Sequence, residues 1–152
     1  MSPLATVVLL LTARAALLCP DSNWVATGDG DCYLPLPGDL FKTTAEDAEV
    51  ACRDFEPTAT LPEVHNYEDQ LTLDQLADGL AVWLGLYRDS EYDPWFWPSS
   101  NVSYYRWATD NPDEDIFLGD CAYTKDSYWY NMDCVNSTFS VVCFTTDEAL
   151  EE

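Results

Sequence analysis

The segment WATDNPDED, residues 107–115, gathers several oxygen-bearing side chains within a few positions of one another. Asn111 and Asp113 flank Pro112, and the segment holds no lysine or arginine. Three further acids complete it: Asp110, Glu114 and Asp115. Calcium prefers carboxylate, amide and carbonyl oxygens, whereas carboxylates without a cation repel one another. The segment is therefore a candidate calcium site, and the alternative interpretation is a solvated acidic loop.

Catalytic chemistry has little support in the sequence. His65 is the only histidine, and its place before a predicted helix suits a surface or capping residue. Glycine-rich phosphate loops and the G-x-S-x-G motif do not occur. Acids are so numerous that close carboxylate pairs arise without a glycosidase site. We therefore expect a binding protein and not an enzyme.

The charge of the chain is strongly negative. Its 28 acids against 6 lysines and arginines give a formal charge of −22. Nucleic acid is excluded as a partner because its phosphates require basic residues, and anionic membranes are disfavoured for the same reason. Solubility in a salty exterior explains the charge simply. Attraction to divalent cations or to cationic surfaces is the alternative.

The N-terminus resembles a secretory signal. The apolar run LATVVLLL, residues 4–11, is followed by Ala13-Arg14-Ala15, a small-residue cleavage pattern. The run is too short to span a bilayer, so we expect no membrane insertion. The sequence predicts a signal peptide over residues 1–15, a domain over 16–146, an acidic frayed tail over 147–152, and an extracellular, secreted product.

Export changes how the cysteines are interpreted. All six follow the predicted signal, and an even number in a short exported chain predicts three disulfides, with 15 pairings allowed by number alone. Asn101 and Asn136 begin Asn-x-Ser/Thr sequons and are candidate glycosylation sites.

The helices and strands that could position the acidic segment are predicted from the spacing of apolar residues and from capping, glycine and proline residues. Residues 19–41 favour a hairpin. A capping-box pattern at Thr43 and Glu46 begins a helix that ends before Pro57. Asn66 begins a second helix, whose end is marked by Gly79. Its predicted buried stripe is Leu73, Leu76 and Leu80.

Residues beyond the second helix favour strands around a long loop. The run AVWLGLY, residues 81–87, predicts a buried strand, and two more strands are expected around 122–123 and 139–144. Residues 88–120 show no long element, and a loop of that length inside a domain is usually functional.

The order of these landmarks resembles one known family. CPDSNW, Cys32-Tyr33 and a helix with Cys52 come first; LPEVHNYEDQ, VWLGL, WFW, YYRW and NPD follow, and the series ends with Cys121, Trp129, Cys134 and Cys143. This set resembles the C-type lectin-like domain in its long, six-cysteine form. The resemblance implies an α+β fold of two helices and small antiparallel sheets below a long loop region, with Trp95 and Trp97 packed at the loop base. It also implies the disulfides Cys19–Cys32, Cys52–Cys143 and Cys121–Cys134.

The resemblance gives the acidic segment a role. Asn111-Pro112-Asp113 matches the family's calcium and sugar triplet, in which the proline is cis, and its amide-then-acid order is that of galactose-preferring members. The implied ligands of calcium and glycan are Asn111, Asp113 and Asn131, with Asp120 as a further metal ligand.

Three matched positions depart from the family pattern, and one of them is Asn131, where an aspartate is expected. Gly119 stands where a carboxylate is expected, and Tyr130 where an asparagine is expected. We therefore predict at most weak calcium binding, which Gly119→Glu with Tyr130→Asn should strengthen. Asp133 and the other nearby acids offer substitute ligands.

Two functional hypotheses follow. The first is a secreted protein that recognises a glycan or glycoprotein through its long loops. The second is an interaction protein that has lost the sugar site and binds protein, mineral or ice. The triplet at residues 111–113 favours the first hypothesis, and Gly119 with Tyr130 favours the second.

Overall fold

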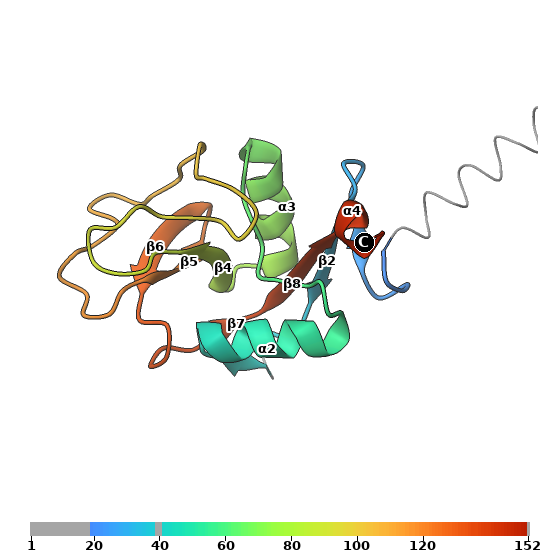
Figure 1. The fold of residues 1–152 in the computed structure, drawn as a ribbon, viewed down its shortest axis with the longest axis horizontal. Helices are drawn as coiled ribbons and strands as arrows, with labels where there is room; N and C mark the ends of the chain where they lie inside the picture. The colour runs from blue at the N-terminus through green and yellow to red at the C-terminus, as the bar shows by residue number, and fades with distance from the viewer. Residues whose placement is uncertain (1–18, 39–40, 152) are drawn as a thin grey trace, which may run out of the picture.

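The computed structural model describes residues 19–38 and 41–151, so the signal-peptide prediction for residues 1–15 lies outside the described residues. The described part forms two sheets with three helices (Figure 1). The three-stranded sheet has the order β1 (Val25–Ala26), β2 (Asp31–Pro35), β8 (Val142–Thr146). The five-stranded sheet has the order β3 (Lys42–Thr43), β7 (Phe139–Ser140), β4 (Val82–Tyr87), β5 (Cys121–Lys125), β6 (Tyr128–Met132). The helices are α2 (Ala45–Phe55), α3 (Tyr67–Ala77) and α4 (Asp147–Leu150). The predicted α+β architecture is confirmed.

Both long helices begin at side-chain caps. Thr44 caps α2, because its hydroxyl accepts from the Asp47 amide at 3.2 Å, so the cap lies one residue after the predicted Thr43. Asn66 caps α3 as predicted, accepting from the Asp69 amide at 2.9 Å. Asp78, in the left-handed conformation, ends α3 just before Gly79.

The buried stripe of α3 differs from the prediction. Leu73 is buried, but Leu76 is only partly buried and Leu80 lies beyond the helix end. The other buried side chains of this face are Gln70 and Ala77. Gln70 is fully buried because both ends of its amide are paired: it accepts from the Trp129 indole at 2.8 Å and donates to the Thr124 hydroxyl at 3.0 Å. A polar residue with such partners is invisible to an apolar periodicity.

Strand β6 and the C-terminal tail are among the elements that differ from expectation. Strand β6 was not predicted, although its buried positions Trp129 and Asn131 alternate as a half-buried strand requires. The tail at 147–150 is a short helix and not a frayed end: Thr146 caps it, and the Asp147 amide donates to the Gly30 carbonyl at 2.9 Å. Within the described residues, no helix has both the length and the apolar character needed to cross a membrane.

The disulfides form as the resemblance implied: Cys19–Cys32, Cys52–Cys143 and Cys121–Cys134. Cys52–Cys143 ties α2 to β8 within a core cluster that also holds Trp24 and Trp83. Cys121–Cys134 joins the start of β5 to the segment after β6. The paired strands β4, β5 and β6, with the Cys121–Cys134 disulfide, form the platform from which the long loop departs.

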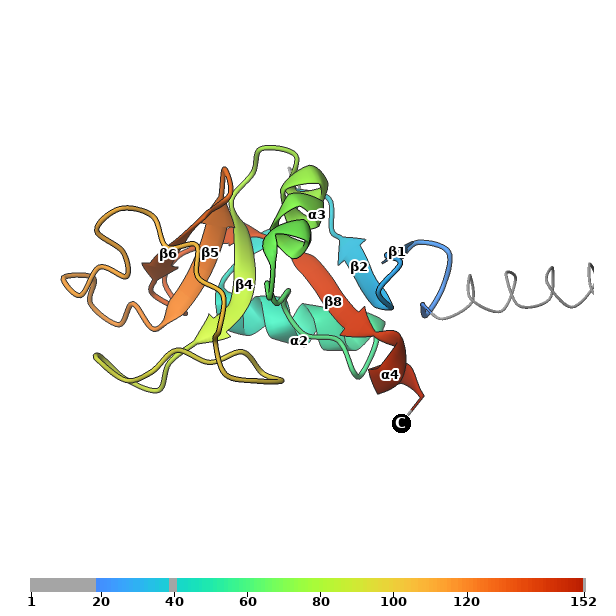
Figure 2. The ribbon, with the colours of Figure 1, turned by 90° about the horizontal axis from the view of Figure 1, so that it is seen from above.

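The loop region gathers at one end of the molecule. In Figures 1 and 2 the segments between β4 and β5 extend beyond β4, β5 and β6, while β2, β8 and α4 lie at the opposite end. Residues 88–120 contain only isolated bridges such as Phe96 to Asn101, in agreement with the predicted long loop. The platform therefore presents about 30 loop residues on one face.

Candidate functional site

Aromatic rings fix the base of the long loop. Trp129 of β6 is fully buried and lies edge-on to Trp97 and Trp107, with ring centroids 5.5 and 5.8 Å away. Trp95 packs against Trp107 at 5.0 Å. The backbone of Trp129 also pairs with the loop, since its carbonyl accepts from the Ala108 amide at 2.9 Å. Trp95 and Trp97 thus pack as predicted, and the residues that follow Ala108 start from a rigid base.

The triplet stands directly after this base. The Asn111–Pro112 peptide bond is cis, as predicted. The Asn111 amide nitrogen donates to the Thr109 carbonyl at 3.1 Å, and the Asp113 carboxylate accepts from the Asp115 amide at 2.9 Å. Both side chains are therefore held by local hydrogen bonds within the loop.

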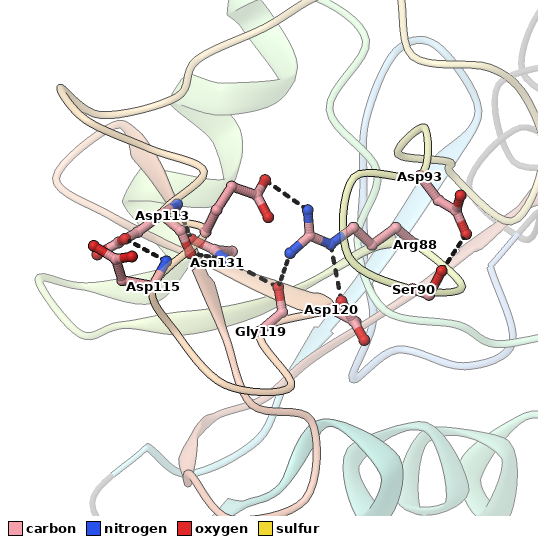
Figure 3. Close-up of polar contacts among 9 residues, drawn as sticks. Arg88, Ser90, Asp93, Asp113, Asp115, Gly119, Asp120 and Asn131 are labelled. Carbon is pink, nitrogen blue, oxygen red and sulfur yellow. Dashed lines mark hydrogen bonds and ion pairs between the residues drawn. The ribbon is translucent and has the colours of Figure 1, made fainter.

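The side chain of Asn131 links two parts of the long loop, one at Asp113 and one at Gly119. It is fully buried on β6, and its Oδ1 accepts from the Asp113 amide at 2.6 Å. Its Nδ2 donates to the carbonyls of Asp113 and Gly119, at 2.9 and 3.0 Å (Figure 3). The structure therefore brings Asn131 beside Asp113, as the resemblance implied. However, the amide is engaged in holding the backbone, because a buried amide must satisfy its hydrogen bonds.

Arg88 supplies a positive charge inside this acidic loop. The residue follows β4 and is 4 % exposed. Its guanidinium donates to Asp120 at 2.8 Å, to Glu114 at 2.7 Å and to the Gly119 carbonyl at 3.3 Å (Figure 3). Burial opposes the charged form, yet hydrogen bonds and ion pairs with Glu114 and Asp120 outweigh it and raise the pKa of Arg88 above its ordinary value. The guanidinium thus neutralises acids that would otherwise repel one another.

The structure explains why glycine stands at position 119 and tyrosine at position 130. A Cβ atom on Gly119 would lie 2.7 Å from Nδ2 of Asn131 and 2.9 Å from Cγ2 of Ile116, so the position is closed to any larger residue without rearrangement. Tyr130 alternates with Asn131 along β6 and stacks on Tyr123, with ring centroids 5.1 Å apart. Gly119→Glu with Tyr130→Asn would therefore disturb the loop instead of completing a metal site, which changes the sequence-based expectation.

Of the other acids considered as substitute ligands, Asp110 and Asp115 are exposed on the loop, and Asp133 is held by local hydrogen bonds. Asp133 accepts from the amides of Val135 and Asn136, and the hydrogen bond from Val135 lowers the pKa of its carboxyl group. Among residues 19–38 and 41–151, no group of three or more histidines, cysteines or acids is placed to hold a metal ion. With Asp120 paired to Arg88 and Asn131 bound to backbone, the residues present do not fit a calcium ion.

The comparisons with known proteins agree with this architecture. The family model described as the lectin C-type domain matches residues 41–145. The chain belongs to the C-type lectin domain family. Members of the family are generally binding proteins without catalytic activity, and they include both sugar-binding and non-sugar-binding proteins. The predicted fold and family are therefore confirmed.

Individual relatives of this C-type lectin domain are distant. The CD302 antigen of Bos taurus is 30 % identical over 145 residues, which cover 90 % of this chain and 61 % of that protein. The chain thus spans about three fifths of the length of the CD302 antigens it matches. The cow C-type carbohydrate-recognition domain of CD23, solved in the presence of an oligosaccharide, matches with a TM-score of 0.73 and 21 % identity, over 84 % of this chain and 95 % of that one. A calcium-independent type II antifreeze protein matches with a TM-score of 0.69 and 22 % identity, over 84 % and 94 %.

One residue that organises the candidate site of this C-type lectin domain was missed by the sequence analysis. Arg88 was not singled out, although it is a rare basic residue that directly follows a buried apolar strand and enters an acidic loop. That position is a usable signal, because a charge at the end of a buried strand needs a partner. Asn101 and Asn136 are exposed, which suits their predicted glycosylation.

Proposed function

We propose that this C-type lectin domain is a non-enzymatic module that binds a protein ligand through its long-loop face without calcium. The Arg88 network carries the calcium-independent part of this proposal. Glu114 and Asp120, two carboxylates of the acidic loop, are both held by one buried guanidinium. A divalent cation at this position would have to compete with a charge that the protein already supplies.

The engagement of Asn131 supports the same conclusion. Its three hydrogen bonds hold the segment around Asp113 and Gly119, so turning its oxygen toward an ion would release buried backbone groups. Leaving such groups unpaired costs about 1–3 kcal/mol each. This cost adds to the lack of a side-chain oxygen at Gly119 and weakens calcium binding further.

Glycan recognition is the second candidate function. The observation that favours it is the Asn111-Pro112-Asp113 triplet, which keeps its place after the tryptophan base. Its side chains could hydrogen-bond a sugar directly, as the names of several relatives would suggest. Export to an oxidising compartment is part of both proposals, and the three disulfides and two sequons support it.

Calcium titration calorimetry and a glycan array, each run with calcium and with a chelator, test the proposed function. We expect no saturable heat up to about 1 mM calcium, the concentration range of weak extracellular sites, and no glycan signal that the chelator removes. A saturable calcium site with chelator-sensitive galactose binding would contradict the proposal and restore the first sequence-based hypothesis.

A further inference from the structure

Two exposed aliphatic or phenyl side chains of the long loop stand together at one turn. Phe117 is 83 % exposed and Leu118 is 51 % exposed. The Gly119 amide donates to the Ile116 carbonyl at 3.2 Å and closes a turn with Phe117 and Leu118 at its two corners. Turn corners usually carry glycine, proline, asparagine or aspartate. Two large apolar residues at these positions are therefore unexpected on structural grounds.

The backbone of Leu118 strengthens this point. Its φ is 56°, in the left-handed region that glycine and asparagine occupy at lower cost. A bulky residue in that conformation is uncommon, and such residues concentrate at functional sites. Leucine therefore occupies a backbone conformation that glycine or asparagine would adopt at lower cost. This indicates that the Leu118 side chain itself has a role.

The turn is presented from a rigid base. The Gly119 carbonyl, at the end of the turn, accepts hydrogen bonds from both Asn131 and Arg88. Both donors are buried, so the turn is held by the same network that takes the place of a metal site. A binding group that is ordered before association loses less conformational entropy when it binds.

The surroundings of the turn are acidic. A surface cavity of about 350 Å³ separates residues 88–91 from residues 114–120. Its lining includes the exposed acids Asp89, Glu91 and Asp115, which form no ion pair within the described part of the chain. Negative charge also acts on neighbouring Tyr92: the charge of Glu91 foremost, then its hydrogen bond with the phenol, with the charges of Glu114 and Asp115, raise the pKa of that phenol. The apolar turn therefore projects beside a negative rim.

We propose that Phe117 and Leu118 are the anchor of the long-loop face, and that they enter an apolar socket, surrounded by lysine and arginine, on a protein partner. This inference rests on the proposed protein-binding function and names the chemistry of its partner. Apolar anchors ringed by polar contacts carry most of the energy in protein interfaces. Acids around the anchor attract a basic rim and repel anionic lipid, nucleic acid and a second copy of this acidic chain.

A peptide selection tests the anchor. A random peptide library is displayed and selected on the immobilised chain in chelator, and the affinities of the enriched peptides are measured on purified variants. Phe117→Ser with Leu118→Asn removes the anchor, and asparagine suits the left-handed backbone. Phe55→Ser is the matched control, because Phe55 is 59 % exposed and is the last residue of α2. The C-terminal end of α2 lies away from the long loops (Figure 1). Circular dichroism verifies that each variant is folded.

A second pair of variants tests the acidic rim. Asp89→Lys with Glu91→Lys reverses two rim charges, and Asp54→Lys with Glu148→Lys makes the same change in net charge at exposed positions outside the loops. We expect enriched peptides that combine apolar with basic residues. Their binding should weaken roughly tenfold or more in the anchor and rim variants, and change by less than about twofold in the two controls.

The outcomes separate this inference from the proposed function. Some peptides could lose affinity with Tyr105→Ser and yet bind the anchor and rim variants as tightly as the unsubstituted protein. Such peptides would refute the anchor but remain consistent with the proposed function. Peptides that ignore every loop variant would overturn both. Anchor-dependent binding to phosphatidylcholine vesicles, or anchor-dependent self-association in sedimentation, would overturn the basic-protein partner.

Discussion

Arg88 and Asp120 close the stem of the long loop twice. The Arg88 amide donates to the Asp120 carbonyl at 3.0 Å, and the Arg88 Nε donates to the Asp120 carboxylate at 2.8 Å. Arg88 directly follows β4, and Asp120 directly precedes β5. One residue pair therefore continues the strand pairing and also neutralises a charge, so that the loop departs from a closed, rigid stem.

Arg88→Gln should destabilise the domain substantially. The substitution leaves Glu114 and Asp120 without a cation, and their side chains are 30 % and 22 % exposed. Removing one partner of a buried pair costs about 3–5 kcal/mol, and partial exposure lowers our expectation to about 2–3 kcal/mol. Urea unfolding measures the loss. Arg53→Gln is the control, because its 3.7 Å pair with Glu49 is half exposed and should contribute less than about 0.5 kcal/mol. Equal losses in the two variants would contradict a special role for Arg88.

The same substitution should change the response to calcium. Removing the guanidinium leaves Glu114 and Asp120 free to bind a cation, so Arg88→Gln is expected to gain thermal stability when calcium is added. The unsubstituted protein should show no such gain. Differential scanning fluorimetry with calcium or a chelator measures both. Adding Glu114→Gln to the variant should remove the gain. A calcium shift already present in the unsubstituted protein would show that Arg88 does not displace the ion.

Asn131→Asp should weaken the fold without creating a useful calcium site. The aspartate would lose both donors to the carbonyls of Asp113 and Gly119 and place a charge at a fully buried position. We expect a loss of about 2–4 kcal/mol near neutral pH. Because a buried carboxyl has a raised pKa, the loss should shrink in acid. Unfolding at pH 7 and pH 4.5 measures this. Unchanged stability together with a new calcium site would show that the amide is not structural.

Gly119→Ala should disturb the loop by steric overlap alone. The added methyl carbon would lie 2.7 Å from Asn131 Nδ2 and 2.9 Å from Ile116 Cγ2. Overpacking of this kind costs about 1–3 kcal/mol. Gly28→Ala is the matched control, since a Cβ there meets nothing within 4 Å. Thermal unfolding of the two variants compares them, and equal melting temperatures would mean that the loop adapts freely.

Much of the fold could be predicted because its signals are local or ordered along the chain. The cap at Asn66 and the strand predicted at 81–87, which the structure places at 82–87, depend on short patterns, and the disulfide pairing follows from the order of landmarks that resembles the family. The cap of α2 was predicted one residue early, because Thr43 and Thr44 are adjacent hydroxyl residues and only the structure shows that Thr44 binds the Asp47 amide. β6 was missed because its tyrosines and asparagine obscure the alternation that Trp129 and Asn131 produce.

The site could be predicted only in part. The sequence located the triplet and the departures at Gly119 and Tyr130, since those follow from matched positions. It could not show that Arg88, 26 residues from Glu114 along the chain, reaches into the acidic loop. Nor could it show that the Asn131 amide is consumed by backbone carbonyls. Both facts depend on tertiary contacts, which no local pattern encodes.

Asp31 should make stability depend on pH. The pKa of its carboxyl group is raised from 3.8 to about 6 in the folded protein, chiefly by desolvation. The negative charges of Asp69, Asp29 and Asp147 raise this pKa further, and the charge of His65 lowers it in part. Between these two pKa values the folded state holds more protons than the unfolded state, so stability falls as pH rises from about 4 to about 6. Asp31→Asn removes this loss. Allowing for partial solvent screening, the variant should gain about 1–2 kcal/mol over the unsubstituted protein at pH 7 and little at pH 4. Asp29→Asn, at an exposed position, is the control. Urea unfolding across this pH range measures the difference, and a gain that does not vary with pH would refute the role assigned to Asp31.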